Sequence, residues 1–313
     1  MLCASSLPDG QVISVNPSAF PLRLMSARDS AANRVGLATA QMRANLSAAA
    51  RTYLAELGIS DPDAGPDLAG LVWMHALAIG YSPAYLADNA DGIRRDWPRI
   101  PLPVSREALE ASADLGRRVA ALLDTEADAP GVTAGAVEPA LRTMGVLTKV
   151  GGGALDPDAG DLAVTVGWGY AGKGDVTMPG KGRLVERPYE KAELDAIADA
   201  AKARDLSPEQ VMALLGPSTR DVYLNDRAYW KNVPAGVWEY VIGGYQVIKK
   251  WLSYREKALL GRALKPEEAR EVTNMARRLT AIVLLQPALD ENYRAVKGQT
   301  WPWPHARQAG TEA

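Results

Sequence analysis

Glycines, lysines and one glutamine gather in a short stretch of the C-terminal half. Gly243 and Gly244 precede Gln246, and Lys249 and Lys250 follow it. We expect a helix to begin directly after the glycines, so that its free N–H groups and the bare backbone approach an anion. A glutamine amide pairs bidentately with adenine, and lysines neutralise phosphates. The stretch therefore predicts a contact with nucleic acid.

A second interpretation of this stretch stays open. It is a strand–helix corner in which Tyr245, Val247 and Trp251 fill the core while the lysines are only solvated. Residues 245–265 nevertheless hold six Lys or Arg residues and one Glu, the sharpest charge bias in the chain. This bias favours a basic surface.

A polar and aromatic turn around Asn225 is the next candidate. Arg227 would pair bidentately with guanine, and Lys231 would meet a phosphate. The alternative is a loop that anchors a sheet, with Arg227 paired to Asp226 or Glu239. Nothing in the local sequence separates these two interpretations.

Three cations surround a glycine-rich connection at 169–182. They are Lys173, Lys181 and Arg183. We expect a mobile loop that enters a groove and becomes ordered on binding. An ordinary flexible hairpin is the alternative.

Residue types that carry catalysis or bind metals are scarce. His75 lies in an apolar stretch and is expected in the core, while His305 is 230 residues away and has no ligand pattern near it. A Ser–His–Asp hydrolase is therefore unsupported. The aspartates at 156–161 lack the closing glutamate of a calcium loop, and Cys3 is the single cysteine. We therefore predict no catalytic residue and no metal site.

Composition sets the class of protein. The 313 residues are 47% hydrophobic, which allows a sizeable core, and the 35 basic and 37 acidic side chains give a net charge of −2. Any nucleic-acid contact must then come from a local patch. No apolar stretch reaches 18 residues and no signal peptide is evident, so we expect a protein of the reducing cytoplasm with no membrane contact.

The elements that would hold these residues suggest an α+β fold, with a helical N-terminal part packed on a mixed β/α part. Helical periodicity favours helices across 31–125, and Lys265 opens a final helix that reaches about Leu285. Alternating apolar residues suggest strands at 162–168 and 183–189. The expected organisation is an irregular segment 1–30, a helical part 31–125, a linker 126–160, an α+β domain 161–296 and a tail 297–313.

Two segments carry a resemblance to a known family. Residues 81–103 read YSPAYLADNADGIRRDWPRIPLP, similar to a segment that follows the methyltransferase core in many DNA adenine methylases of restriction systems. Residues 222–234 (VYLNDRAYWKNVP) and 237–255 (VWEYVIGGYQVIKKWLSYR) resemble the hallmark of the type ISP C-terminal specificity domain. Together with the connecting helices, the resemblance covers roughly residues 68–295.

The resemblance implies double-stranded DNA as the ligand. In that family one long polypeptide carries a nuclease, a helicase-like motor, an adenine-N6 methyltransferase and a target-recognition domain, so S-adenosylmethionine and ATP are implied for the full enzyme. This sequence lacks the Asn/Asp-Pro-Pro-Tyr/Phe tetrapeptide and a Gly-Lys-Ser/Thr phosphate loop; Asn16 and Pro17 come nearest to the former. We therefore expect no cofactor for this chain.

The hypothesis at this point is a DNA-recognition module for phage defence, with a methyltransferase or helicase–nuclease polypeptide as a further partner. Two alternatives remain. One is an inactive fragment of a DNA adenine methyltransferase, and the other is a protein-interaction scaffold with no role at DNA.

Overall fold

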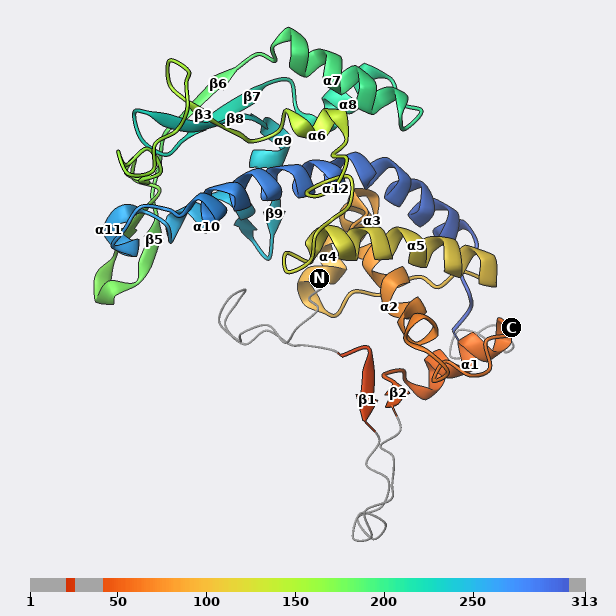
Figure 1. The fold of residues 1–313 in the computed structure, drawn as a ribbon. Helices are drawn as coiled ribbons and strands as arrows, with labels where there is room; N and C mark the ends of the chain where they lie inside the picture. The colour runs from red at the N-terminus through yellow and green to blue at the C-terminus, as the bar shows by residue number, and fades with distance from the viewer. Residues whose placement is uncertain (1–20, 26–41, 304–313) are drawn as a thin grey trace. The chain divides into compact units, whose positions relative to one another are not determined.

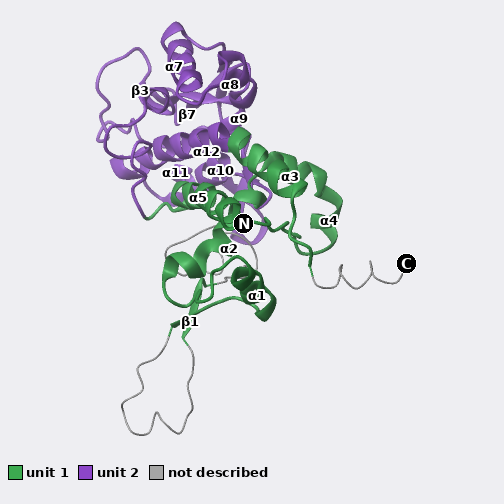
Figure 2. Cartoon of the chain, turned by 90° about the vertical axis from the view of Figure 1, so that its right-hand side faces the viewer, with its two compact units in different colours: residues 1–126, 286–313 green, residues 127–285 purple. Residues whose placement is uncertain are grey.

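The structure is a computed structural model that describes residues 21–25 and 42–303 (Figure 1). Its contacts divide the chain into two units (Figure 2). Unit 1 comprises residues 1–126 and 286–313, and unit 2 comprises residues 127–285. Both helices and antiparallel strands are present, which confirms the predicted α+β class.

Unit 1 is mainly helical because its sequence supplies a start signal for each longer helix. Ser47, Ser82 and Ser105 each accept a backbone N–H at a helix N-terminus, and prolines occupy the first turns of two helices. The elements are β1 (Arg23–Met25), β2 (Met42–Ala44), α1 (Ala48–Glu56), α2 (Pro66–Gly80), α3 (Pro83–Asp88), α4 (Ala90–Arg95) and α5 (Arg106–Leu123).

Strand β2 lies inside residues 31–125, the part predicted to be mainly helical. It pairs with β1 in antiparallel register. The Asp63 carboxylate explains the local departure from helix, because it accepts the Ala44 N–H at 2.6 Å and pairs with Arg51 at 2.9 Å. These contacts hold the strand beside the beginning of α1.

The proline-rich segment 99–103 is held by its carbonyl groups. Tyr85 Oη donates to Arg99 O at 3.1 Å, and Tyr53 Oη donates to Pro103 O at 2.9 Å. The backbone N–H of Trp301 donates to Leu102 O at 2.7 Å. Because Pro101 and Pro103 have no N–H, the backbone at these two positions can take part in hydrogen bonds only as an acceptor. The Arg-Ile-Pro-Leu-Pro motif is therefore a structural feature of unit 1.

His75 is a buried core residue, as predicted. Its Nε2–H donates to Pro101 O at 2.8 Å, and its Nδ1 accepts from Ser112 Oγ at 2.7 Å. Ser112 Oγ accepts in turn from Asn292 Nδ2 at 2.9 Å. Burial lowers the pKa of His75 from its ordinary value of 6.5 to about 4, although the bond to Pro101 opposes this shift.

Unit 2 is built on an antiparallel four-stranded sheet in the order β3-β8-β7-β6. Trp230 and Val222 are paired across β7 and β8 and are fully buried, and Trp230 Nε1 donates to Ala269 O of α12 at 3.0 Å. The elements are α6 (Pro139–Arg142), β3 (Val146–Lys149), β4 (Gly169–Ala171), η2 (Lys173–Asp175), β5 (Thr177–Pro179), β6 (Leu184–Arg187), α7 (Lys191–Lys202), α8 (Pro208–Leu215), β7 (Thr219–Tyr223), β8 (Ala228–Pro234), α9 (Ala235–Trp238), β9 (Val241–Ile242), β10 (Tyr245–Gln246), α10 (Val247–Ser253), α11 (Lys257–Leu260) and α12 (Pro266–Gly298).

Two predicted features of unit 2 differ in the structure. Residues 126–160 contain α6 and β3, so the expected linker supplies an edge strand of the sheet. Residues 162–168 form no strand. Their hydrogen bonds go to separate partners, since Thr165 N donates to Leu224 O while Val164 O accepts from Lys257 N.

The last helix and the tail also differ from prediction. Helix α12 runs past the expected end near Leu285 and contains Pro287, which leaves one helical carbonyl without its usual donor. Trp301 of the expected tail is buried, its Nε1 donates to Glu56 Oε2 at 2.8 Å, and it packs edge-on against Tyr53. In the part of the chain described, no helix is both long and apolar enough to cross a membrane.

Replacing His75 tests the hydrogen-bonded core of unit 1. We expect His75→Leu to lower the free energy of unfolding at pH 7.5 by about 2–3 kcal/mol, because Pro101 O and the Ser112 hydroxyl lose their partner. The folded-state pKa of His75 lies below the unfolded value, so the unfolded chain binds the proton first as pH falls. The parent chain should therefore lose up to about 3 kcal/mol between pH 6.5 and pH 4 from this residue, and the leucine variant should not.

Urea unfolding followed by tryptophan fluorescence at pH 7.5 and pH 5 measures both effects. Ser112→Ala is the matched control, since it removes a partner of His75 but leaves the titrating ring in place. Equal pH dependence in the parent and in His75→Leu would show that another group dominates this window.

Candidate functional site

Gly243 and Gly244 form the turn of a hairpin. They join β9 to β10, and their φ angles are +59° and +85°. Consecutive positive φ angles are typical of a tight hairpin turn, in which glycine carries no steric penalty. The prediction that these glycines open a helix is therefore wrong. Helix α10 begins at Val247, with Gln246 as its N-cap.

Aromatic rings position the cations of α10. Lys250 Nζ lies 4.5 Å from the ring centroid of Tyr245 and 4.7 Å from that of Tyr254, so the ammonium group sits beside two rings. Arg255 stacks over Trp251 at 4.5 Å. Tyr245 and Tyr254 are 51% and 43% exposed, so these are surface clusters rather than core. Such contacts hold a cation in place without neutralising it.

Core assignments around α10 were right in part. Ile248 and Leu252 are fully buried, as expected for the inner face of this helix. Trp251 and Val247 are only partly buried, and Tyr245 is exposed. Helix α10 thus has an apolar inner face and a cationic, aromatic outer face.

The glycine-rich connection is an antiparallel hairpin, named here the ribbon (β4, η2 and β5). Its base is fixed by Glu256, whose buried carboxylate accepts the N–H groups of Gly167 at 3.1 Å and Trp168 at 2.8 Å. Trp168 is fully buried, and its Nε1 donates to Tyr223 O at 2.8 Å. The ribbon therefore has an ordered base, in contrast to the mobile loop that the glycines suggested.

The glycines at this base permit close packing. A Cβ on Gly169 would lie 1.9 Å from Ser253 O of α10, and a Cβ on Gly182 would lie 2.1 Å from the Trp168 ring. Gly182 also has a φ of +65°. Larger residues would separate the ribbon from α10, so these glycines serve packing.

The predicted residues in the β7–β8 turn have partners within the chain. Asn225 is buried; its Nδ2 donates to Asp161 O and Ala163 O, and its Oδ1 accepts from Arg227 N and Ala228 N. All of its hydrogen-bonding capacity serves the turn. We therefore leave Asn225 out of any ligand-contacting surface.

The nearby arginines form ion pairs, though not the expected ones. Arg227 Nε lies 3.4 Å from Asp161 Oδ1 rather than near Asp226 or Glu239. Asp226 pairs instead with Arg183 at 2.5 Å. Glu239 pairs with Arg220, a contact on the other side of the turn.

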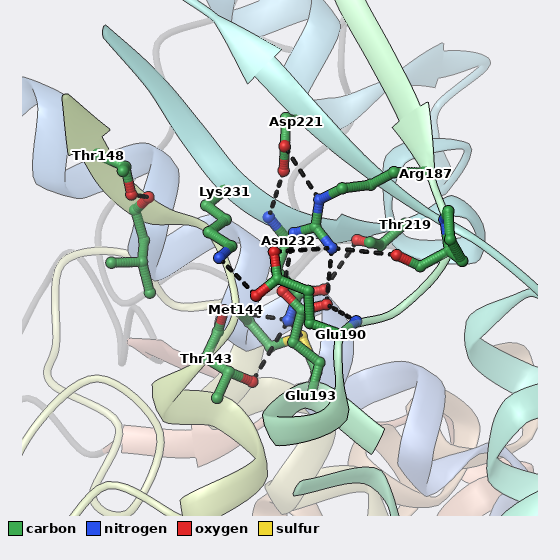
Figure 3. Close-up of polar contacts among 12 residues, drawn as sticks. Thr143, Met144, Thr148, Arg187, Glu190, Glu193, Thr219, Asp221, Lys231 and Asn232 are labelled. Carbon is green, nitrogen blue, oxygen red and sulfur yellow. Dashed lines mark hydrogen bonds and ion pairs between the residues drawn. The ribbon is translucent and has the colours of Figure 1, made fainter. Parts of the chain in front are cut away.

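A buried polar network fixes the sheet to α7 (Figure 3). Arg187 donates bidentately to Glu193, with both bonds 2.8 Å long, and donates to Asp221 at 3.0 Å. These carboxylates raise the pKa of Arg187. Lys231 joins the network through Glu190 at 2.8 Å, and this bond raises the pKa of Lys231. The predicted phosphate contact Lys231 is thus engaged by a carboxylate.

Asn232 completes the network. It is buried, and its φ of +59° is one that asparagine tolerates better than most residues. Its side chain accepts from Thr219 and donates to Thr143 O, while its backbone N–H donates to Asp221 (Figure 3). Sequence reasoning did not identify this network, because its members come from segments far apart in the chain.

The acidic residue Asp161 and the groove of unit 1 are weaker candidates for a ligand site. Asp161 accepts the Asp156 N–H and pairs with Lys149, which lowers its pKa. No group of three His, Cys, Asp or Glu residues within 21–25 and 42–303 is arranged to hold a metal ion. A largely apolar groove of about 910 Å³ lies in unit 1 beside Trp73 and Ile100, and none of the predicted DNA contacts lines it.

Comparisons with known proteins give one family and one solved structure. A family model described as "Type ISP C-terminal specificity domain" matches residues 1–282. No curated protein matches the chain. The solved "cryoEM structure DrdV-DNA complex" is similar at 17% identity and a TM-score of 0.42, over 80% of this chain and 20% of that one. The chain thus spans about a fifth of the length of that solved chain.

Removing the Glu256 charge tests how the ribbon is anchored. We expect Glu256→Gln to speed hydrogen exchange at Gly167 and Trp168, because an amide offers one acceptor oxygen where the carboxylate offers two. The loss in local stability should be about 1–3 kcal/mol. Hydrogen exchange read by NMR or mass spectrometry over 165–182 measures it. Glu271→Gln, at an exposed position of α12, should leave these amides unchanged; equal exchange in both variants would contradict the anchoring role.

Proposed function

The chain belongs to the family of type ISP C-terminal specificity domains, and from this membership we propose that it recognises double-stranded DNA in a restriction–modification system. The observation that carries the proposal is a set of cations on α10 and the ribbon. Among the described residues none of these cations forms an ion pair, although Arg255 lies near enough to Glu268 to help lower the pKa of that carboxyl, whereas most other cations of unit 2 form ion pairs. The set is Lys173, Lys181, Lys249, Lys250 and Arg255, named here the basic surface.

The elements of the basic surface lie against each other. Helix α10 contacts both β4 and β5, and Lys181 follows β5 directly. The carboxylate of the buried Glu256, which lies next to α10, is occupied by two backbone N–H groups, whereas Asp175 in the turn of the ribbon is exposed. A phosphate that approaches α10 therefore meets positive charge without an exposed carboxylate competing at the helix itself.

Lys250 and Arg255 are suited to phosphate contact because they are already ordered. Their rings hold them in place, so less side-chain entropy is lost when a ligand binds. Gln246 stands at the beginning of the same helix, and its side chain makes no capping bond. We propose Gln246 as a base-contacting residue and Gly243 with Gly244 as an exposed turn that lets the duplex come close.

Arg183 and Arg227 are assigned secondary positions in this proposal. The Arg183–Asp226 pair is exposed, and exposed pairs contribute little, so Arg183 can exchange its carboxylate for a phosphate. Arg227 is half-exposed but bonded to Ala159 O and Asp161. We propose no DNA contact for Lys231, since Glu190 occupies it.

We assign no catalytic residue and no cofactor to this chain. In this proposal the chemical steps belong to a methyltransferase or helicase–nuclease polypeptide, as the resemblance of residues 81–103 to a segment following a methyltransferase core suggests. S-adenosylmethionine and ATP would be bound there.

Charge reversal on α10 tests the proposal. We expect Lys249→Glu with Lys250→Glu to weaken binding to a pool of random-sequence duplexes. The slope of log K against log salt should decrease by roughly two, because each lost phosphate contact removes about 0.9 from it. Fluorescence anisotropy between 50 and 250 mM salt would give both quantities.

Lys191→Glu with Lys202→Glu, both on exposed positions of α7, is the matched control because it makes the same change in net charge. Its affinity should stay much nearer to that of the parent. If both double variants lost the same amount of affinity, net charge alone would explain the loss, and the assignment of phosphate contacts to α10 would be wrong.

A further inference from the structure

The ribbon exposes apolar side chains along one face, from the residue pair next to its anchored base to the turn. Tyr170, Val176 and Met178 are 54%, 59% and 41% exposed. Tyr170 lies directly opposite Met178 in the antiparallel register, so both side chains are on one face of the ribbon. This short hairpin thus presents a small apolar face that no described residue covers.

The two ends of the ribbon have different chemistry. At the base, Glu256 and the glycines fix the backbone against α10. At the turn, Lys173 and Asp175 are both exposed, and neither forms an ion pair among the described residues. An anchored base with an exposed apolar face is an arrangement that can hold side chains at fixed positions against a ligand.

The dimensions and charge of the ribbon fit duplex DNA. Two paired strands are about 4.8 Å apart, and the major groove of B-form DNA, about 12 Å wide, admits a two-stranded ribbon. The lysines of α10 and the ribbon lie near its base and tip, where they complement phosphates along the groove.

We infer that the ribbon enters the major groove of the bound duplex, and that Tyr170 and Met178 are specificity-determining residues there. This inference rests on the proposed DNA-binding function. The Tyr170 hydroxyl donates to or accepts from base edges, and the Met178 and Val176 side chains contact the thymine methyl group. Lys249 and Lys250 contribute affinity that is independent of sequence.

Contacts to bases and contacts to phosphates can be measured separately. Selection of bound duplexes from a randomised pool, followed by sequencing, would give the base preference of the parent chain. In Tyr170→Ala with Met178→Ala we expect the preference to fall by roughly 5- to 100-fold at one or more base pairs, the range expected for one lost base contact. The salt slope on random-sequence duplexes should stay that of the parent, because no cation has been removed.

Dimethyl sulfate footprinting on a selected duplex supplies a second measurement. Guanine N7 faces the major groove, so the parent should protect one or more guanines and the alanine variant should lose that protection. Leu194→Ala, which also removes an exposed apolar side chain but on α7, should behave as the parent.

The outcomes distinguish the inference from the function on which it rests. A parent with no salt-dependent binding to any duplex would overturn the proposed function and the inference with it. A parent that selects a sequence, together with an alanine variant that selects the same one with equal preference, would overturn the inference alone. Protection confined to adenine N3 in the minor groove would also overturn it.

Discussion

The carboxylate of Glu256 occupies the junction at which three parts of unit 2 meet. It belongs to the N-cap residue of α11, three residues after the end of α10. It accepts the two N–H groups that precede β4 and thereby fixes Trp168, whose indole donates to the carbonyl of Tyr223 at the end of β7. Trp168 also packs against Trp238 of α9, with ring centroids 5.3 Å apart. One buried anion thus sets the position of the ribbon relative to the helix and the sheet. A buried charge is tolerated there because backbone donors satisfy it.

The electrostatics of the chain follow from how its cations are divided. With a net charge of −2, the protein has no general attraction for a polyanion. Arg187, Lys231 and Arg227 are committed to carboxylates in the sheet and its turn. Among the described residues, Lys249 and Lys250 of α10 and Lys173 of the ribbon form no ion pair, and aromatic rings rather than acids position Lys250. Cations committed to ion pairs and cations without one are therefore distinguished by their partners, and residue type alone does not show which is which.

The sequence was informative wherever a local signal had one meaning. The α+β class, the buried His75 and the basic window at 245–265 were all predictable from short-range patterns. It misled where a residue type serves two purposes. Paired glycines suit both a helix N-terminus and a hairpin turn, and only the pairing of β9 with β10 decides between them. The Asn225 amide likewise suits a base edge or a turn.

Other features were hidden because their partners are distant in the chain. Strand β3 has four residues in a Gly- and Asp-rich region, and it is defined by pairing with β8 about eighty residues later. The network around Arg187 joins residues from three strands and a helix N-terminus. The hallmark segment 222–234 contributes Trp230 to the core and Asn232 to this network, so much of what identifies the family specifies the fold. The exposed side chains of the ribbon are not required for the fold in this way.

Unit 1 is discontinuous, and this has a consequence for biosynthesis. Its first segment ends at residue 126, and its remaining side chains, among them Asp290, Tyr293 and Trp301, follow the whole of unit 2. A ribosome must therefore release unit 2 before unit 1 can close its core. Until then Tyr53 and Leu102, which pack with Trp301, lack part of their cover. Transiently exposed apolar side chains of this kind favour aggregation, so the order of the segments makes completion of α12 the step that protects this core.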